Sequence, residues 1–315
     1  MQLFHNKSGV DLMDRKLPKI SVISAVYNKA HSLDDYIFAL TEQTYKGDIE
    51  VILVDDKSTD NSAMIIKNLQ KKYNKNNFQI KFIQNEKNIG NCASRNRGIQ
   101  KAEGEILVVI DADCIVNEFF LEEHVIGHQK NFDVCIGPMG IESRGRDIFK
   151  MRKELIKNDA LINKEMRLQY PRKKTCFLNC VTRNFSITKA FLKKMNEPLF
   201  DEIFTYKNDT ESGFGWEDVE MGFRIFKKGG KIYFTPRAIS IHKSHAPSIP
   251  DSIKPLLSLK NFARLLRKHR EIAVIAPDWT AETFQKIYNW LKMYNYADNH
   301  DTKFISSLIK GNFKK

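Results

Sequence analysis

Two pairs of carboxylates stand out because each follows directly on a short aliphatic run. Asp111 and Asp113 end one such run, and Asp55 and Asp56 end another. Carboxylates this close repel each other, and a hard divalent cation such as Mg²⁺ or Mn²⁺ neutralises them while taking its remaining ligands from substrate phosphates. The spacing therefore indicates metal-assisted chemistry on a phosphate-bearing substrate. Asp111 and Asp113 alone could equally well cap the next helix.

The segment around Asp56 has a second possible role. Ser58 or Asp60 could cap the helix that follows, which would explain part of this polar segment. Capping needs only one of these residues, however, and a carboxylate at a strand end can also accept hydrogen bonds from a nucleobase imide and from ribose hydroxyls. The segment is therefore a candidate nucleotide site.

These side chains need a scaffold, and the apolar pattern predicts one. Short apolar runs alternate with segments of helical spacing in the first part of the chain. The expected strands are 20–25, 48–54, 78–83 and 105–110, and the expected helices are 33–40, 62–73 and 91–101. This alternation predicts an α/β fold with a mostly parallel sheet, in which ligands bind at the carboxyl ends of the strands. The two acidic pairs fall at those ends.

Beyond about residue 117 the alternation weakens. Residues 179–187 and 231–241 have strand-like patterns, 217–228 a helical one, and 144–174 could form a charged helix or a mobile loop. We divide the chain into a leader (1–18), an α/β domain (19–250) and a basic helical C-terminal extension (251–315). Within the domain, 19–116 is the expected nucleotide-binding half and 117–250 the acceptor-binding half.

The net charge of +13, from 51 basic and 38 acidic residues, is unevenly distributed. Residues 144–174 hold 11 basic and 4 acidic side chains, 251–315 hold 12 and 6, and the rest is balanced. A basic nucleic-acid-binding module would interleave basic and aromatic residues across a groove, whereas here carboxylates occupy the strand ends. We therefore expect no nucleic-acid partner. The excess of positive charge in these two segments suits binding to pyrophosphate, to an anionic acceptor or to a membrane surface.

The cysteines and the hydropathy pattern bear on location. Five cysteines are few and odd in number, which favours a reducing compartment, and no apolar run reaches the length of a membrane span. We expect a soluble cytoplasmic protein. The amphipathic segment 253–270 could make peripheral contact with the membrane, or its apolar stripe could pack on its own domain. Cys176 and Cys180 are better explained as apolar filler than as zinc ligands.

Four motifs, in order, resemble the inverting family 2 glycosyltransferases of the GT-A fold. They are Val-Ile-Ser-Ala-Val-Tyr-Asn at 22–28, Glu-Val-Ile-Leu-Val-Asp-Asp-Lys-Ser-Thr-Asp at 50–60, Asn-Ile-Gly with Ala-Ser-Arg-Asn-Arg-Gly-Ile within 88–99, and Asp-Ala-Asp at 111–113. Further on, Asn-Phe-Ser at 184–186, Phe-Asp-Glu at 200–202 and Phe-Gly-Trp-Glu-Asp-Val-Glu-Met-Gly-Phe-Arg at 214–224 are similar to the acceptor half of galactosyl- and N-acetylgalactosaminyl-transferases and of bacterial chondroitin-type polymerases. The resemblance covers roughly residues 19–245.

The resemblance implies a role for each matched residue. Those implied to contact the nucleotide sugar are Ala25, Tyr27, Asp55, Asp56, Asn88, Arg95, Asp111 and Ala112. Those implied to bind Mn²⁺ or Mg²⁺ are Asp111, Asp113 and His242, with His245 as the alternative to His242. Those implied to act on the acceptor are Asp218 as general base, Glu217 as a ligand of sugar hydroxyls and Trp216 as a stacking face. Acidic residues at 217 and 218 could also simply favour a helix dipole.

The basic segment 144–174 falls where related enzymes keep a flexible loop on the acceptor side. We expect its cations to help hold pyrophosphate or an anionic acceptor, unless they form a solvated helix face. The residues concerned are Arg144, Arg146, Arg172, Lys173 and Lys174.

The chemistry is consistent with these roles. Transfer from a nucleoside diphosphate sugar needs a Lewis acid for the departing diphosphate and a base for the acceptor hydroxyl, and one such base without a covalent intermediate gives inversion. We expect a metal-dependent transferase that moves an N-acetylhexosamine or galactose from a UDP-sugar to a glycan acceptor in surface or capsular polysaccharide synthesis. The alternatives are a sugar-nucleotide pyrophosphorylase, which needs a glycine-rich phosphate loop that 24–28 lacks, and a non-catalytic basic nucleic-acid-binding module.

Overall fold

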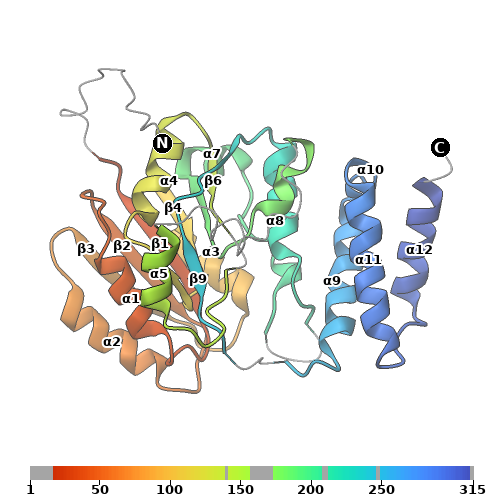
Figure 1. Cartoon of the computed structure of the whole chain (residues 1–315), viewed down its shortest axis with the longest axis horizontal. Helices are drawn as coiled ribbons and strands as arrows, with labels where there is room; N and C mark the ends of the chain where they lie inside the picture. Colours follow the sequence, from red (N-terminus) through yellow and green to blue (C-terminus); the bar gives the residue numbers. More distant parts are fainter. Residues whose placement is uncertain (1–16, 139–140, 157–172, 208–211, 246–248, 313–315) are drawn as a thin grey trace.

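The computed structural model describes residues 17–138, 141–156, 173–207, 212–245 and 249–312. Its centre is a seven-stranded sheet with the strand order β3-β2-β1-β4-β7-β6-β8 (Figure 1). The first four strands in the chain are β1 (Ile20–Val26), β2 (Ile49–Asp55), β3 (Phe78–Gln84) and β4 (Ile106–Val109). These pair in parallel, whereas β7 (Phe185–Thr188) runs antiparallel to both of its neighbours. The predicted mostly parallel α/β sheet is confirmed.

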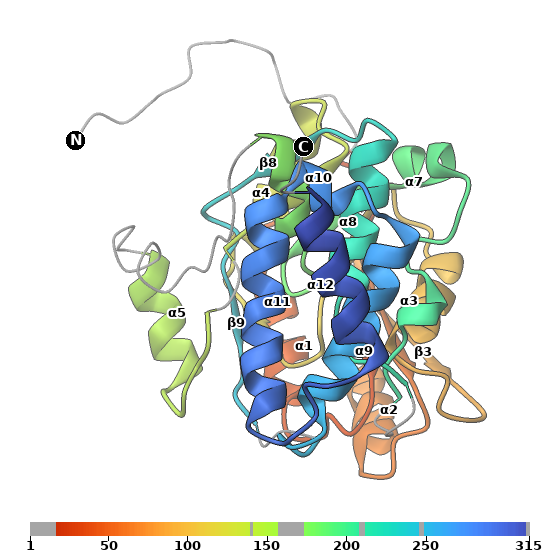
Figure 2. The same cartoon turned by 90° about the vertical axis from the view of Figure 1, so that its right-hand side faces the viewer.

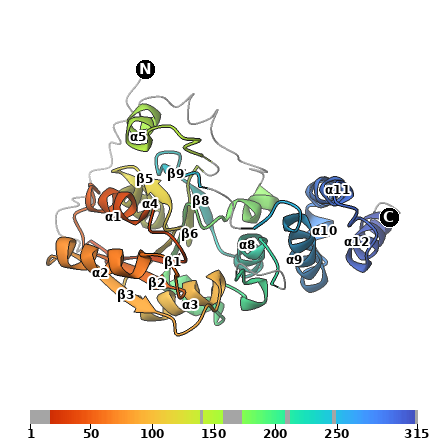
Figure 3. The same cartoon turned by 90° about the horizontal axis from the view of Figure 1, so that it is seen from below.

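Helices cover both faces of this sheet because successive strand residues point to opposite sides. Ile20 and Val22 of β1 pack into one core, and Ile23 packs into the other. The helices of the first core are α1 (Leu33–Thr41), α2 (Ser62–Tyr73), α4 (Phe120–Gln129) and α5 (Ile148–Ile156), and those of the second are α3 (Asn91–Lys101), α7 (Lys189–Met195) and α8 (Glu217–Lys227) (Figure 3). The sheet is therefore the middle of three layers.

Gly98 allows α3 to lie close to the sheet, and we expect Gly98→Ala to lower the free energy of unfolding. A Cβ at this position would lie 2.6 Å from Cγ2 of Ile23 and 3.1 Å from Cγ2 of Val54. Overpacking of this kind costs about 1–3 kcal/mol, which urea denaturation would measure.

Gly311→Ala in α12 (His300–Asn312) is the matched control, since no atom lies within 4 Å of a Cβ built there. Its free energy of unfolding should be unchanged or slightly higher. Equal unfolding midpoints for Gly98→Ala and the wild type would show that α3 moves outward without cost.

A small second sheet consists of β5 (Cys114–Val116) and β9 (Ser240–His242), which are antiparallel. The prediction of a single strand over 231–241 is wrong. The segment forms two strands instead, β8 (Ile232–Phe234) at the edge of the large sheet beside β6 (Val134–Ile136), and then β9. Pro236 lies between β8 and β9, and since proline has no N–H group it ends the ladder at that edge.

The strand expected over 179–187 also begins later than predicted. Residues Lys173–Asn179 form a 3₁₀ helix, η2, and the ladder begins only at Phe185. The intervening residues turn, with the N–H of Asn184 donating to the carbonyl of Val181 at 3.0 Å. In the charged segment 144–174, α5 (Ile148–Ile156) is helical, and 157–172 lie outside the described residues.

The C-terminal residues are helical, as predicted, and the helices α9, α11 and α12 stand side by side beyond α8 (Figures 1 and 2). They are α9 (Lys254–Lys268), the short α10 (Ile272–Ile275), α11 (Pro277–Lys292) and α12. In α9, Leu259, Phe262 and Leu266 are buried in a third core together with Phe177 and Phe223. This burial favours packing of the apolar stripe on its own protein over its insertion into a membrane. Among the described helices, none combines the length and apolarity needed to cross a bilayer.

Candidate active site

A cavity of about 940 Å³ opens where β1, β2 and β4 end. The predicted site residues that line it are Ala25, Tyr27, Asp56, Asn88, Arg95, Asp111, Ala112, Asp113, Trp216, Glu217, Asp218 and His242. Asp55 does not line it. The Asp55 carboxylate is buried and accepts hydrogen bonds from the Ser58 N–H and the Gln84 side chain, so it supports the turn after β2.

The turns after β1 and β2 are locked to each other by side chains. Asn28 adopts a left-handed backbone with a φ of 53°. Its Oδ1 accepts from the N–H groups of Thr59 and Asp60, at 2.8 and 3.3 Å, and its own N–H donates to Ser58 Oγ. Asp60 accepts from the Ser62 N–H and from the Ala30 N–H. The N-cap residue of α2 is Asn61, which makes no side-chain capping bond, so neither Ser58 nor Asp60 is the N-cap.

Asp56 fixes the turn that carries Asn88. Its Oδ1 accepts from the Ile89 N–H at 2.8 Å, and its Oδ2 accepts from the Gly90 N–H at 2.7 Å. Gly90 has a φ of 90°, and a Cβ there would lie 2.2 Å from Thr205 Oγ1, so only glycine suits this turn. Asn88 Oδ1 is buried and has no hydrogen-bond partner among the described residues. A buried acceptor in a cavity wall is suited to a ligand donor.

Arg95 joins the two halves of the site. Its guanidinium lies 2.7 Å from Asp111 Oδ1 and 3.5 Å from Glu217 Oε1. The Asn91 side-chain amide donates to the same Glu217 oxygen at 2.9 Å. Glu217 at the start of α8 is thus held against α3, while its Oε2 is buried without a hydrogen-bond partner in the described part of the chain.

Asp218 is placed to accept a proton. Its Oδ2 accepts from the N–H and the hydroxyl of Thr182 at 3.2 and 3.3 Å, and its Oδ1 has no donor within the described ranges. Burial raises the pKa of the Asp218 carboxyl to about 7, with a further rise from Glu217, while Arg95 opposes the rise. A carboxylate whose pKa lies near neutral pH is suited to general-base catalysis.

Asp113, His242 and His245 form a candidate metal site. Asp113 Oδ2 lies 3.4 Å from Nε2 of His242 and 3.2 Å from Nε2 of His245, and the Lys29 ammonium contacts the same oxygen. The pairing of Cys114 with His242 across β5 and β9 places the adjacent Asp113 at this point.

The donor set at this site suits a divalent cation. One ligand atom from each of Asp113, His242 and His245 falls within 4.8 Å of the others, and Asp113 Oδ1 is buried with no hydrogen-bond partner among the described residues. Imidazole nitrogen together with carboxylate oxygen fits Mn²⁺ better than Mg²⁺. Burial alone would raise the pKa of Asp113, but the two histidines hold it well below its usual range. A second possible ligand group among the described residues consists of Asp111, Asp113 and Cys114, and neither group includes Cys176 or Cys180.

Trp216 is anchored in the C-terminal helices. Its Nε1–H donates to Ser258 at 3.0 Å, and its ring centroid lies 4.8 Å from that of Phe262 and 5.9 Å from that of Trp279. The backbone of Trp216 is left-handed, with a φ of 73°, immediately before α8 begins. Trp216 lines the cavity, and a stacking role for its ring stays a prediction.

Of the basic residues expected near the pyrophosphate, Arg144 and Arg146 are not among the described residues that line the cavity. Arg172 lies outside the described residues, as do the side chains of Lys173 and Lys174. Among the described residues, the lysines and arginines that line the cavity besides Arg95 are Lys29, Arg183, Lys207 and Lys254.

The structure also brings in site residues that the sequence patterns did not single out. Asn91 directly follows the Asn-Ile-Gly motif, so its position was a usable signal. Thr182 and Arg183 come from the turn before β7, and Lys254 comes from the C-terminal extension. No local pattern marks these three, because they reach the site only through tertiary packing.

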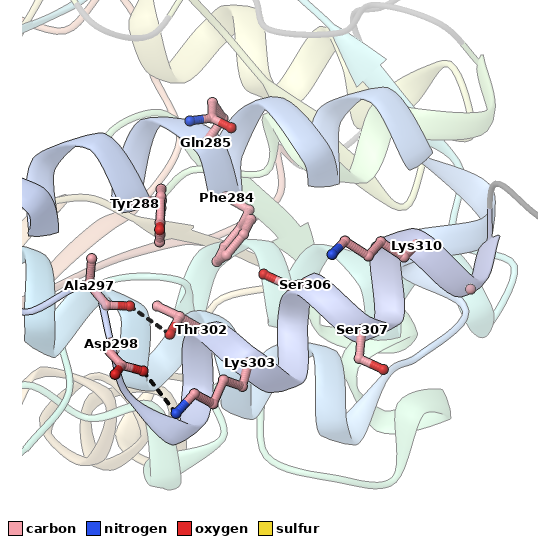
Figure 4. A pocket seen from close by; sticks show the side chains of 11 residues that line it. Phe284, Gln285, Tyr288, Ala297, Asp298, Thr302, Lys303, Ser306, Ser307 and Lys310 are labelled. Carbon is pink, nitrogen blue, oxygen red and sulfur yellow. Dashed lines mark hydrogen bonds and ion pairs between the residues drawn. The ribbon is translucent and has the colours of Figure 1, made fainter.

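A second hollow, of about 920 Å³, lies between α11 and α12, where Phe284 and Tyr288 face Ser306 and Lys310 (Figure 4). Its carboxylate, Asp298, is paired with Lys303 at 2.8 Å. It thus lacks the clustered acidic groups of the first cavity, which is the candidate active site.

The chain matches the family model described as "Glycosyl transferase family 2" over residues 21–195, more than half of its length. The chain belongs to glycosyltransferase family 2. Poly(ribitol-phosphate) β-N-acetylglucosaminyltransferase TarP of Staphylococcus aureus is 30% identical over 232 residues, which cover 69% of this chain and 69% of TarP. An uncharacterised glycosyltransferase of Haemophilus influenzae is 35% identical over 127 residues, which cover 38% of this chain and 49% of that protein. The expected family and enzyme class are confirmed.

Solved structures with the same fold can be superposed on nearly the whole of this chain. Residues 1–349 of S. aureus TarS in complex with UDP-GlcNAc give a TM-score of 0.56 at 16% identity, covering 94% of this chain and 92% of that one. The mannosyltransferase PcManGT from Pyrobaculum calidifontis, in complex with GDP-Man and Mn²⁺, gives 0.57 at 15% identity, covering 94% and 80%. At these identities the likeness shows the fold alone, and it confirms the predicted GT-A architecture.

Proposed function

We propose that this family 2 enzyme is a metal-dependent inverting transferase that moves a sugar from a UDP-sugar to a glycan acceptor of a bacterial surface or capsular polysaccharide. One observation carries the proposal: the Asp113 cluster and the Asp218 carboxylate line the same cavity, with Arg95 between Asp111 and the start of α8. The name of TarP and the UDP-GlcNAc complex of TarS support UDP as the nucleotide and an N-acetylhexosamine as the sugar. Galactose stays the second candidate, because a relative that is 28% identical over 261 residues is named cholesterol galactosyltransferase.

The donor side of the cavity would bind the nucleotide diphosphate. Asp113 with His242 and His245, and Asp111 beside them, would hold a divalent cation, which when bound supplies positive charge to the departing diphosphate. The unpaired Asn88 Oδ1 accepts from the base, and the Asp56 carboxylate fixes the turn that presents it. The Lys29 ammonium provides a further positive charge at this edge.

The acceptor side would activate the attacking hydroxyl. Asp218 Oδ1 takes the hydroxyl proton while the hydroxyl oxygen attacks the anomeric carbon on the face opposite the diphosphate. A bond from the anomeric carbon to the acceptor oxygen forms, the bond to the diphosphate oxygen breaks, and UDP leaves with the electron pair. A single displacement inverts the configuration. Glu217 Oε2, which is buried and unpaired among the described residues, accepts from a sugar hydroxyl.

The purified protein should be incubated with a panel of UDP-sugars and MnCl₂, with and without acceptor extracts, while UDP release is measured. We expect one UDP-sugar, an N-acetylhexosamine, to give release that EDTA abolishes and added Mn²⁺ restores. Absence of turnover and of hydrolysis with every nucleotide sugar would refute the proposal.

The pH dependence follows from the position of Asp218, whose pKa burial raises to about 7. Below that pH the carboxyl holds its proton and cannot accept another, so kcat/KM should fall about tenfold per pH unit, and above it kcat/KM should level off. Initial rates between pH 5 and 9 would test this, and Arg95→Met should move the falling limb to higher pH because it removes an opposing charge. A flat profile down to pH 5 would mean that another group is the base.

We place the reaction in the cytoplasm. The five cysteines are free thiols, and four of them are buried, which suits a reducing compartment. Membrane docking through the apolar stripe of α9 is not part of the proposal, because that stripe is buried in the protein.

A further inference from the structure

Glu142 contacts His242 through the ring nitrogen that does not face Asp113. Glu142 Oε2 lies 2.7 Å from Nδ1 of His242, while Nε2 of the same ring lies 3.4 Å from Asp113 Oδ2. A carboxylate can only accept, so Nδ1 carries a hydrogen and donates it. The contact therefore fixes the ring orientation and directs Nε2 toward Asp113.

Glu142 is itself held from two directions. Its Oε1 accepts from the Arg183 guanidinium at 2.7 Å. Its backbone runs beside β9, since the His242 N–H donates to the carbonyl of Ile141 at 2.8 Å and the Ser143 N–H donates to the carbonyl of His242 at 2.9 Å. Glu142 is not among the described residues that line the cavity, so its effect on a ligand would pass through His242.

Arg183 connects this contact to the other half of the site. It follows Thr182, whose N–H and hydroxyl hold Asp218. The turn before β7 thus holds Asp218 through Thr182 and Glu142 through Arg183.

We propose that Glu142 is a positioning residue, which orients His242 for metal binding and is held in turn by Arg183. The inference rests on the metal site of the proposed function. Carboxylates that accept from the distal N–H of a metal-binding histidine typically affect metal affinity about 10–100-fold when removed.

The test is the affinity of the full chain for MnCl₂, measured by calorimetry in the absence of donor and acceptor. Glu142→Ala should weaken Mn²⁺ binding about 10–100-fold. Glu142→Gln should lose less, because its amide oxygen still accepts from Nδ1–H. Glu154→Ala, which removes an exposed glutamate on α5, is the matched control and should bind Mn²⁺ as the wild type does. Circular dichroism would verify that each variant is folded.

Three results would overturn the inference, and they separate it from the proposed function. If Glu142→Ala binds Mn²⁺ as tightly as the wild type while Asp113→Asn does not bind, Glu142 has no positioning role and the metal site stands. Equal losses for Glu142→Ala and Glu142→Gln would show that charge, rather than ring orientation, is responsible. If the wild type itself binds no Mn²⁺, both the inference and the metal dependence fail.

Discussion

Asp218→Asn is expected to lower kcat by about 10²–10⁴-fold, the contribution typical of a general base, while the affinity for UDP stays unchanged. The amide can still accept from Thr182, so the geometry at the start of α8 is preserved, but it cannot take up a proton. UDP release under saturating donor and acceptor would measure the loss, and calorimetry with UDP would measure the affinity.

Thermal unfolding shows whether Asp218→Asn loses activity because the base is gone or because the fold is damaged. Burial raises the pKa of Asp218 to about 7 in the folded protein, whereas in the unfolded chain the carboxyl ionises at about pH 4. The carboxyl therefore lowers the free energy of unfolding increasingly from about pH 4 to about pH 7 and by the full amount above that, which a neutral amide does not do. The Asp218→Asn melting temperature at pH 8 should therefore equal or exceed that of the wild type. Asp34→Asn, which changes an exposed carboxyl on α1, should leave kcat and UDP affinity as they are. Loss of UDP binding in Asp218→Asn would mean that the base lies elsewhere.

Asp113→Asn is expected to weaken Mn²⁺ binding strongly and to lower kcat by about 10³-fold, since bound metal contributes several kcal/mol to the transition state and each 1.36 kcal/mol is tenfold. The carboxylate is the central group of the cluster, in contact with His242, His245 and Lys29. A neutral amide there would leave the basic groups without their counter-charge. Mn²⁺ calorimetry and UDP release would measure both effects.

The matched control for Asp113→Asn is again Asp34→Asn, which should bind Mn²⁺ normally. High activity of the wild type in excess EDTA would contradict this prediction, because it would show that transfer proceeds without a metal. Activity of Asp113→Asn close to that of the wild type, with Mn²⁺ affinity intact, would place the metal on other ligands.

The N-terminal half of the α/β domain was predictable because its signals are local. The helices over 62–73 and 91–101 have the expected bounds, because polar turns flank both and because Ile65, Ile66 and Leu69 have helical spacing in the first. The carboxylates at 56, 111 and 113 reach one cavity because parallel strands end at one edge of the sheet. Asp55, which was predicted to contact the nucleotide, does not line the cavity. Neighbouring residues at a strand end point to opposite sides, so Asp55 and Asp56 could not both face it.

The second half was less predictable because its contacts span long stretches of chain. Glu142 meets His242 across 100 residues, and Thr182 meets Asp218 across 36. Each pair depends on strand pairing and turns that no periodic pattern encodes. Pro236 was a visible signal that 231–241 could not be one continuous strand.

The anchoring of Trp216 has a consequence for how this enzyme can be cut or recombined. The match to the family model ends at residue 195, ahead of the proposed general base Asp218. Trp216 ties the start of α8 to α9 and α11 through Ser258, Phe262 and Trp279. A tryptophan whose backbone is in the left-handed region has a conformational energy about 1–3 kcal/mol higher than usual, and it persists only where surrounding contacts hold it. A chain truncated at residue 250 would release that restraint and expose the indole to water. A chimera that exchanges acceptor specificity between relatives should therefore transfer α8 and the helices after it as one inseparable unit.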